Sequence, residues 1–442
     1  MSTRNSVTGA RMAADDTTRL TQMTLDCKVI YGVKRGEHLR ADGEPGNWKQ
    51  KGLTLIGLGV LVVFLAGLGI YTFVMAVSTR LHPNPKDVPS VALAAPSPKW
   101  AAAVDKGRQL ARAGLVQQNL PGLSVAVGVG GEIVWAEGFG WADMEKRVAV
   151  APGMRFRIGH TSKALTSAAA GLLIEKDRLR LNDEIQNYVP EFPRKQWPVT
   201  LRQLMGNTAG IRHYESEEDS RPAAHCDRET EGLKRFAEHP LRFEPDTQYG
   251  YSTFGWVLVS AAIEAAAKEP LSTFMRTQVF TPLGMTATTF DSSTEPIPDR
   301  VTFYQRRFTG DGGEGVVPAA AGDYSCLAGA GAILSTPADL VRFGMAMNGG
   351  KLLQSDTIRK LQTPQVLTSG KETEYGLGWM VEEVTLAGEP TRMVHHASRS
   401  LKGGTTSFMT FPARGMVVAV TANIANAITR DIALAIAQAF VE

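Results

Sequence analysis

The chain has 442 residues, which is enough for more than one domain, and its composition of 43% hydrophobic and 21% charged residues is that of a globular protein with some membrane character. Its net charge is +3 without a dense block of Lys or Arg, which excludes nucleic acid as the main partner. Three cysteines form no Cys-x-x-Cys pair, and the eight histidines form no His-Glu-x-x-His pattern. The sequence therefore predicts no metal site and no cofactor.

The first element along the chain is an uncharged run over residues 52–77. As a helix this run spans roughly 39 Å, longer than the hydrocarbon core of a bilayer. A buried core helix and a signal peptide cleaved near Ala76-Val77-Ser78 are alternatives, but about 50 mostly polar residues before the run exceed an ordinary n-region. We therefore expect a cytoplasmic tail (1–51), a transmembrane signal anchor (52–78), a proline-rich linker (79–99) and a globular domain (100–442).

The charges that flank this run predict its orientation in the membrane. Positive residues concentrate before it and are sparse after it: Lys34, Arg35, Arg40, Lys49 and Lys51 precede the run, and Arg80 and Lys86 follow it. Because positive flanks stay on the cytoplasmic side, the N-terminus is predicted to be cytoplasmic and the C-terminal domain periplasmic or otherwise extracytoplasmic. Cys226 and Cys326 would then share a compartment in which disulfides form, although the sequence leaves their pairing open.

The globular part begins and ends with strands. In chain order we expect a helix over 101–117, strands over 123–129 and 132–137 joined by Gly130-Gly131, a helix over 162–176, a mainly helical middle to about 375, strands over 406–411 and 416–421, and a helix over 428–441. This order predicts a mixed α/β (α+β) fold in which one antiparallel sheet is split between the two ends of the domain. The site is expected in the cleft between this sheet and the inserted helical lobe.

The segment Arg155-Phe-Arg-Ile-Gly-His-Thr-Ser-Lys163 resembles the active-site segment of the penicillin-recognising serine hydrolases, of the class C beta-lactamase and D,D-peptidase type. The similarity runs from about Gln118 to Asn423 and is strongest to mitochondrial serine beta-lactamase-like proteins and their bacterial relatives. Further matching motifs are Pro121-Gly-Leu-Ser-Val-Ala-Val, Gln186-Asn-Tyr-Val-Pro-Glu-Phe-Pro, Gly210-Ile-Arg-His-Tyr-Glu, Tyr251-Ser-Thr-Phe-Gly, Pro282-Leu-Gly-Met and Tyr375-Gly-Leu-Gly-Trp. The resemblance implies a beta-lactamase/transpeptidase-like fold.

The resemblance also implies a Ser-x-x-Lys motif, whose serine attacks a carbonyl while the lysine takes its proton. In this register Lys163 fills the lysine position, but His160 stands where the nucleophilic serine belongs. Ser162 does not substitute for it, because neighbouring helical residues diverge by roughly 100° and do not face one pocket. Acylation by the Ser–Lys pair is therefore predicted to be lost or strongly reduced.

The resemblance implies two further motifs, and in both of them this sequence departs from the family pattern. Tyr-x-Asn appears as Tyr251-Ser252-Thr253, with the tyrosine relaying a proton. The Lys/His-Thr-Gly strand is either His396-Ala397-Ser398 or Lys402-Gly403-Gly404, and both lack the usual Thr-Gly. Asn207 lies in an altered segment near the same cleft. We expect Thr253, His396, Ser398 and Asn207 to contact substrate.

These residues are compatible with two functions. The first is acyl transfer or hydrolysis of an amide or ester, with a peptide, ester or beta-lactam-like molecule as substrate and His160 as nucleophile or activator of water. The second is a membrane-anchored pseudoenzyme that binds a peptide or assembles with identical copies.

Overall fold

The computed structural model of the chain describes residues 59–69, 71–72, 80–216, 219, 225–306, 315–399 and 403–441. The chain divides into two units, Met1–Ala66 and Gly67–Glu442. The predicted tail 1–51 lies outside the described residues, as does part of the predicted anchor 52–78, within which residues 59–69 and 71–72 are helical. Among the residues described, no helix combines the length and the apolar character that crossing a membrane requires.

In the described part of the second unit, eight strands form one antiparallel sheet. Its strands, from one edge to the other, are β1 (Ser90–Ala92), β3 (Glu132–Asp143), β2 (Gly122–Val129), β13 (Met416–Ala422), β12 (Thr405–Phe411), β11 (Glu389–Arg399) and β10 (Met380–Leu386), and β4 (Val148–Ala149) pairs with β3. Strands from both ends of the domain meet where β2 pairs with β13, which confirms the predicted split sheet.

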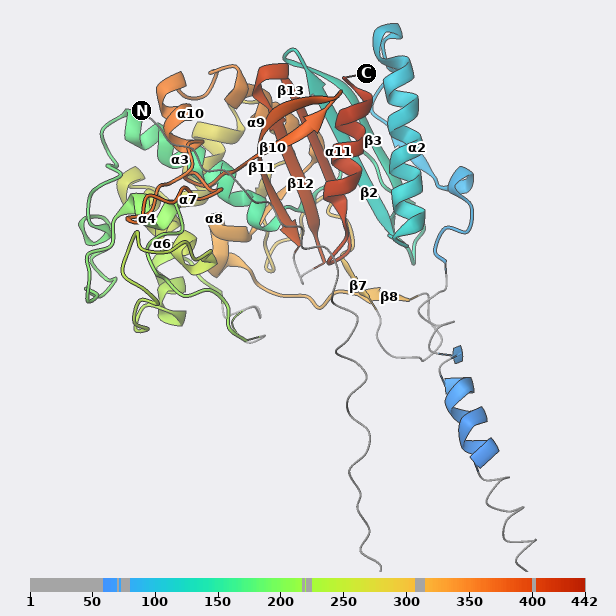
Figure 1. Ribbon diagram of the computed structural model, residues 1–442, viewed down its shortest axis with the longest axis horizontal. Helices are drawn as coiled ribbons and strands as arrows, with labels where there is room; N and C mark the ends of the chain where they lie inside the picture. Colours follow the sequence, from blue (N-terminus) through green and yellow to red (C-terminus); the bar gives the residue numbers. More distant parts are fainter. Residues whose placement is uncertain are drawn as a thin grey trace, which may run out of the picture. The chain divides into compact units, whose positions relative to one another are not determined.

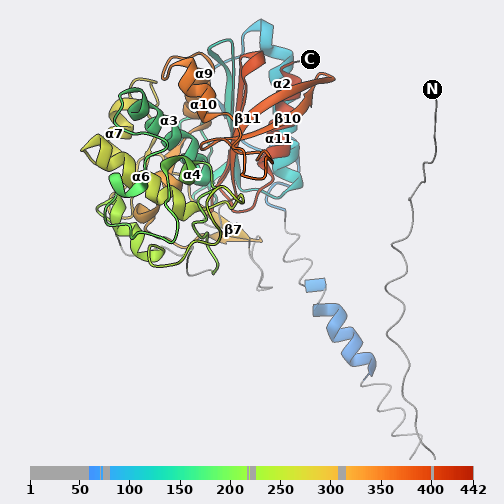
Figure 2. The same cartoon turned by 60° about the vertical axis from the view of Figure 1, so that its left-hand side comes forward.

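Both faces of this sheet are buried at its central strands. Along β13, Val417 and Ala419 pack into the core beneath the helical lobe, whereas Val418 and Val420 pack into the core on the opposite face. The alternation follows from the period of two in a strand. Helices α2 (Ala101–Gln117) and α11 (Thr429–Ala439) cover that opposite face, and the two lie side by side at one end of the domain (Figures 1 and 2).

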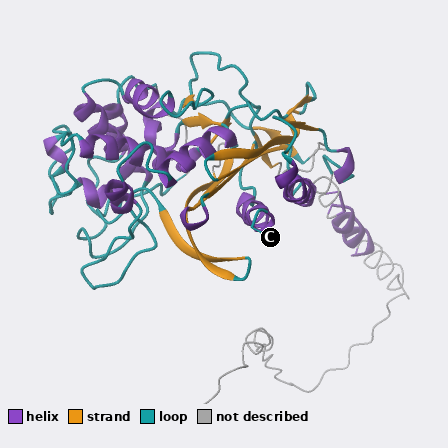
Figure 3. Ribbon diagram, turned by 90° about the horizontal axis from the view of Figure 1, so that it is seen from above, coloured by secondary structure: helices purple, strands orange, loops and turns teal. Residues whose placement is uncertain are grey.

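The other face carries the inserted lobe, whose helices gather on one side of the strands (Figure 3). They are α3 (Ser162–Glu175), α4 (Leu201–Met205), α6 (Thr253–Ala267), α7 (Leu271–Met275), α8 (Ala328–Gly331), α9 (Pro337–Asn348) and α10 (Ser355–Leu361). Short strands complete the fold: β5 (Phe156–Arg157), β9 (Ile333–Ser335) and β6 (Thr289–Phe290) pair together, and β7 (Tyr304–Arg306) pairs with β8 (Val316–Pro318).

The predicted elements are confirmed with shifted ends. The helix over 101–117 is found as predicted, and the two terminal strands lengthen by one residue each. The second strand of the first hairpin, predicted to end at residue 137, continues to Asp143. Its extra residues include Gly138 and Gly140, which weaken a strand prediction but are needed here, because a Cβ at Gly138 would lie 2.2 Å from the Val150 carbonyl oxygen.

Candidate active site

His160 lies in the turn that opens α3, and Lys163 lies at the start of that helix. The chain leaves β5 through Gly159, whose φ of +52° is easy for glycine, and passes through the 3₁₀ turn Gly159–Thr161 into the helix. His160 is half-buried, whereas Lys163 is completely buried. The turn therefore places an imidazole at the surface of the site and an amine behind it.

The Lys163 amine is held by polar but uncharged partners. Its Nζ donates hydrogen bonds to the Thr253 hydroxyl and to the Ala330 carbonyl, both at 3.2 Å. Among the described residues, no carboxylate lies within ion-pair distance of it. Burial lowers the pKa of Lys163 well below its ordinary value of 10.5. Burial thus favours the neutral form of this amine, the form that can act as a base.

The Thr253 hydroxyl joins this amine to His160. Its Oγ1 lies 3.1 Å from Nε2 of His160. The imidazole is thus engaged within the protein through Nε2, by the same hydroxyl that accepts a hydrogen bond from Lys163.

Three buried hydroxyls line the cleft beside His160. They belong to Tyr251, Ser398 and Thr406, and none of them has a hydrogen-bond partner among the described residues. The cleft has a volume of about 350 Å³. The centres of the Tyr251 and His160 rings are 5.6 Å apart, and Lys163 Nζ lies 4.8 Å from the centre of the Tyr251 ring. Since buried polar groups are normally paired, these hydroxyls are suited to a polar ligand.

The strand β11 supplies the other wall. His396 is buried, its Nε2 lies 3.2 Å from the Tyr375 hydroxyl, and burial followed by the charge of Lys163 lowers its pKa well below 6.5. His396 and Ser398 both line the cleft, which favours the register that starts at His396. In the alternative register, Lys402 lies outside the described residues, and a Cβ at Gly404 would lie 2.4 Å from the Arg157 carbonyl oxygen, away from the cleft.

Asn207 supports the site from behind instead of lining the cleft. It is 2% exposed, and its Oδ1 accepts a hydrogen bond from the Ser252 backbone amide at 3.1 Å. Its φ of +58° is a conformation that asparagine tolerates better than most residues. The geometry makes it a support for the Tyr251–Thr253 turn.

His213 is a part of the site that sequence reasoning missed. Its Nδ1 accepts a hydrogen bond from the Thr253 backbone amide at 3.2 Å, and its ring stacks on Tyr214. Burial, followed by the charge of Lys163, lowers its pKa to about 4. The motif Gly210-Ile-Arg-His-Tyr contained the signal, but only as a family marker. Within the part of the chain that the structure describes, no three His, Cys, Asp or Glu side chains form a metal-binding group.

The depressed pKa of His213 predicts a loss of stability in acid. Between about pH 6.5 and 4 the unfolded chain binds a proton on this imidazole that the native protein excludes, so the free energy of unfolding falls as the pH drops through this window. The contribution is at most about 3 kcal/mol. His213→Asn, which cannot titrate, is expected to flatten this part of the profile in urea unfolding at several pH values. An unchanged slope would contradict the role of His213.

A larger groove of about 880 Å³ continues from the cleft. The two share Met380, Ala397 and Arg430. Arg430 and His395 both contact Glu382 Oε1, at 2.9 and 2.8 Å, and these hydrogen bonds lower the pKa of Glu382. The ion pairs fix Arg430 at the junction, so a ligand longer than the cleft can continue from there into the groove.

The sequence profile of the family described as Beta-lactamase matches residues 107–441. The chain belongs to this family. The human mitochondrial serine beta-lactamase-like protein LACTB is 28% identical over 443 aligned positions, which cover 77% of this chain and 80% of the relative. The family resemblance predicted from the sequence is therefore confirmed.

Solved structures agree with the fold. The octameric penicillin-binding protein homologue from Pyrococcus abyssi matches with a TM-score of 0.64 at 23% identity, over 75% of this chain and 76% of that one. D-amino acid amidase from Ochrobactrum anthropi, solved with L-phenylalanine amide, matches with a TM-score of 0.62 at 22% identity, over 73% and 91%. The fold of this chain is thus the mixed α/β fold of beta-lactamases and penicillin-binding proteins.

Proposed function

We propose that this chain is a membrane-anchored member of the beta-lactamase family that binds an amide- or ester-containing ligand, peptide-like or beta-lactam-like, in the cleft beside His160. Acylation by a Ser–Lys pair is lost or strongly reduced. One observation carries the proposal: the hydrogen-bonded chain Lys163–Thr253–His160 ends in an imidazole at the position that the family resemblance assigns to the nucleophilic serine. The Nε2 atom of that imidazole is hydrogen-bonded within the protein.

Ligand binding is supported by the three unpartnered hydroxyls of the cleft. Tyr251, Ser398 and Thr406 offer donors at a buried surface. A carbonyl or carboxylate oxygen accepts such donors, and each hydrogen bond to a neutral group contributes about 1 kcal/mol. An amide, ester or beta-lactam carries these acceptors in a molecule small enough for the cleft.

The binding role predicts a graded loss of affinity. A beta-lactam and phenylalanine amide are expected to bind the purified full chain without reacting, as measured by saturation-transfer NMR. Tyr251→Phe and Ser398→Ala, each of which removes one hydroxyl, are expected to weaken binding about five-fold. Ser292→Ala, which changes a serine far from this cleft, serves as the matched control. Equal binding by all variants would place the ligand elsewhere.

Residual hydrolysis is the second candidate function, and one observation favours it. Burial lowers the pKa of Lys163 and so favours its neutral form, and this amine is connected to His160 through Thr253. An imidazole at this position can attack a carbonyl or activate water. A chromogenic ester distinguishes the two functions: turnover that is abolished by His160→Ala would establish catalysis.

The membrane anchor and its orientation belong to the same proposal. Supporting it are the uncharged run 52–77, its charge asymmetry and the disulfide between Cys226 and Cys326, since disulfides persist in oxidising compartments. A reporter that is active only in an oxidising compartment, fused after Glu442, is expected to work, whereas the same reporter fused before the run is expected to be silent. The opposite pattern would reverse the proposed topology.

A further inference from the structure

The disulfide between Cys226 and Cys326 lies directly beside the segment that holds Lys163. Cys226 precedes the 3₁₀ segment Glu229–Arg235 (η5), and Cys326 lies in the turn Ser325–Leu327 (η7), 100 residues later. Cys226 is half-buried, whereas Cys326 is only 5% exposed. The turn η7 runs straight into the four-residue helix α8, so the sulfur bridge ties α8 to η5.

On the Cys326 side, α8 contacts the site through two carbonyls. The Gly329 carbonyl accepts a hydrogen bond from the Thr166 hydroxyl at 2.7 Å, and the Ala330 carbonyl accepts the one from Lys163 at 3.2 Å. A Cβ at Gly329 would lie 2.7 Å from Thr166 Oγ1 and from Ser260 Oγ. The helix is therefore pressed closely against α3 and α6, only three and four residues after Cys326.

On the Cys226 side, hydrogen bonds connect η5 to the residues that precede Thr253. The carbonyl of Arg235 accepts a hydrogen bond from Arg212 at 2.8 Å, and the carbonyl of Arg212 accepts one from the Ser252 hydroxyl at 2.7 Å. Ser252 is followed by Thr253, the second partner of the Lys163 amine. The disulfide thus links the segment that supplies the Ala330 acceptor of Lys163 to η5, which is connected to the Thr253 acceptor through Arg212 and Ser252.

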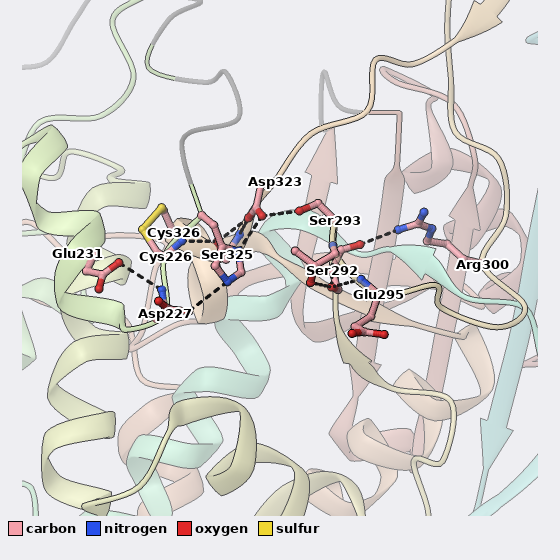
Figure 4. A network of polar contacts seen from close by, with 12 residues as sticks. Cys226, Asp227, Glu231, Ser292, Ser293, Glu295, Arg300, Asp323, Ser325 and Cys326 are labelled. Carbon is pink, nitrogen blue, oxygen red and sulfur yellow. Dashed lines mark hydrogen bonds and ion pairs between the residues drawn. A yellow bond between two sulfur atoms is a disulfide. The ribbon is translucent and has the colours of Figure 1, made fainter.

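Polar contacts surround the sulfur bridge (Figure 4). The Cys226 backbone amide donates to the Ser325 hydroxyl at 2.9 Å, and Asp323 accepts hydrogen bonds from Ser325 and Ser293. Burial alone would raise the pKa of Asp323, but these hydrogen bonds and that of His225 outweigh it and lower the pKa. These contacts shape the loop before α8 but do not hold α8 itself.

Helix α8 has little stability of its own. Its sequence is Ala328-Gly-Ala-Gly331, far shorter than the length at which an isolated helix becomes stable, and half of it is glycine. Its position therefore depends on tertiary contacts. Among the described residues, the disulfide is the one covalent cross-link.

We propose that the Cys226–Cys326 disulfide is a redox-sensitive clamp on the lysine of the site, which a dithiol reductant releases. One thiolate of the dithiol attacks the sulfur of Cys226, the less buried of the two cysteines, the S–S bond breaks, and Cys326 leaves as a thiolate that takes up a proton. The second thiol then displaces Cys226 and closes the reagent into its own disulfide. The protein gains two electrons and two protons, and α8 is freed from η5.

Chemical labelling of Lys163 in the full chain in detergent tests the clamp. Sulfo-NHS acetate at pH 8 with peptide mapping reports how often the buried amine becomes reachable. After reduction by dithiothreitol, labelling of Lys163 is expected to rise at least about tenfold, because local opening precedes reaction. Labelling of the exposed Lys99 and Lys176 is expected to stay constant. Amide exchange is expected to rise in 325–331 and to stay unchanged in β12.

Two variants accompany the experiment. Cys226→Ser with Cys326→Ser is expected to show high Lys163 labelling without reductant, whereas Ser293→Ala, which removes a neighbouring hydrogen bond and keeps the disulfide, is expected to behave like the wild type. If the double variant does not fold, the reduced wild type decides alone. Unchanged labelling after verified reduction would overturn the clamp, and so would a loss of protection that includes β12, which would mark a global stabilising bond. The regulatory meaning rests on the proposed function of the cleft, but this readout needs no ligand and can fail independently of it.

Discussion

Replacing His160 by serine is expected to turn a chain that forms no stable acyl adduct into one that does. A hydroxyl at this position, three residues before Lys163, lies on the same face of the turn as the amine, whose lowered pKa makes it a base. The neighbouring Tyr251 hydroxyl is free to relay the proton. Intact-mass spectrometry after exposure to a beta-lactam or fluorophosphonate is expected to show one added acyl or phosphonyl group on His160→Ser.

Two controls make this result specific. Peptide mapping is expected to place the adduct on the introduced serine, and adding Lys163→Ala is expected to abolish it, since Lys163 is the base that the motif pairs with this position. Acylation is expected to be slow, because the strand that normally carries Thr-Gly reads His396-Ala-Ser398 here. An adduct that persists in the double variant would show that Lys163 is not the base.

Replacing Trp379 by alanine is expected to cost about 3–5 kcal/mol of unfolding free energy. Its indole is completely buried, stacks on Phe343 of α9 with ring centres 5.9 Å apart, and lies 6.0 Å from Phe408 of β12. It thus fills the contact between the sheet and the helix that covers its inner face. The measurement is guanidinium unfolding monitored by circular dichroism.

The matched control for this prediction is Trp100→Ala. Trp100 is half-buried and packs against Phe440 at the outer face with the rings tilted and their centres 5.7 Å apart, so its removal leaves a smaller void. It is expected to cost about half as much or less. A loss below about 1 kcal/mol for Trp379→Ala would show that this aromatic cluster is not an essential part of the core.

Strongly patterned segments could be predicted from the sequence. The strand 416–421 is a continuous apolar run, since both faces of β13 are covered. The C-terminal helix is amphipathic, since only one of its faces packs against that sheet. The position of His160 before Lys163 also followed from the motif that surrounds them. These features depend on local spacing, which a sequence carries directly.

Features that depend on distant contacts could not be predicted. The strand β10 is mostly half-exposed and charged, with Glu382 and Glu383 at its centre, so it lacks the apolar alternation of a strand and forms by pairing with β11. The role of His213 depends on the Thr253 amide, 40 residues away. Likewise, the pairing of Cys226 with Cys326 and the contact of Lys163 with the Ala330 carbonyl join residues more than 99 positions apart.

Intact-mass spectrometry of the wild-type chain after prolonged exposure to a beta-lactam and to a fluorophosphonate tests the central claim most directly. With His160 in the place of the nucleophile and its Nε2 engaged by Thr253, the mass is predicted to remain that of the unmodified protein. A stable adduct on Ser162 or any other serine would contradict the account, because the nucleophile would then lie elsewhere.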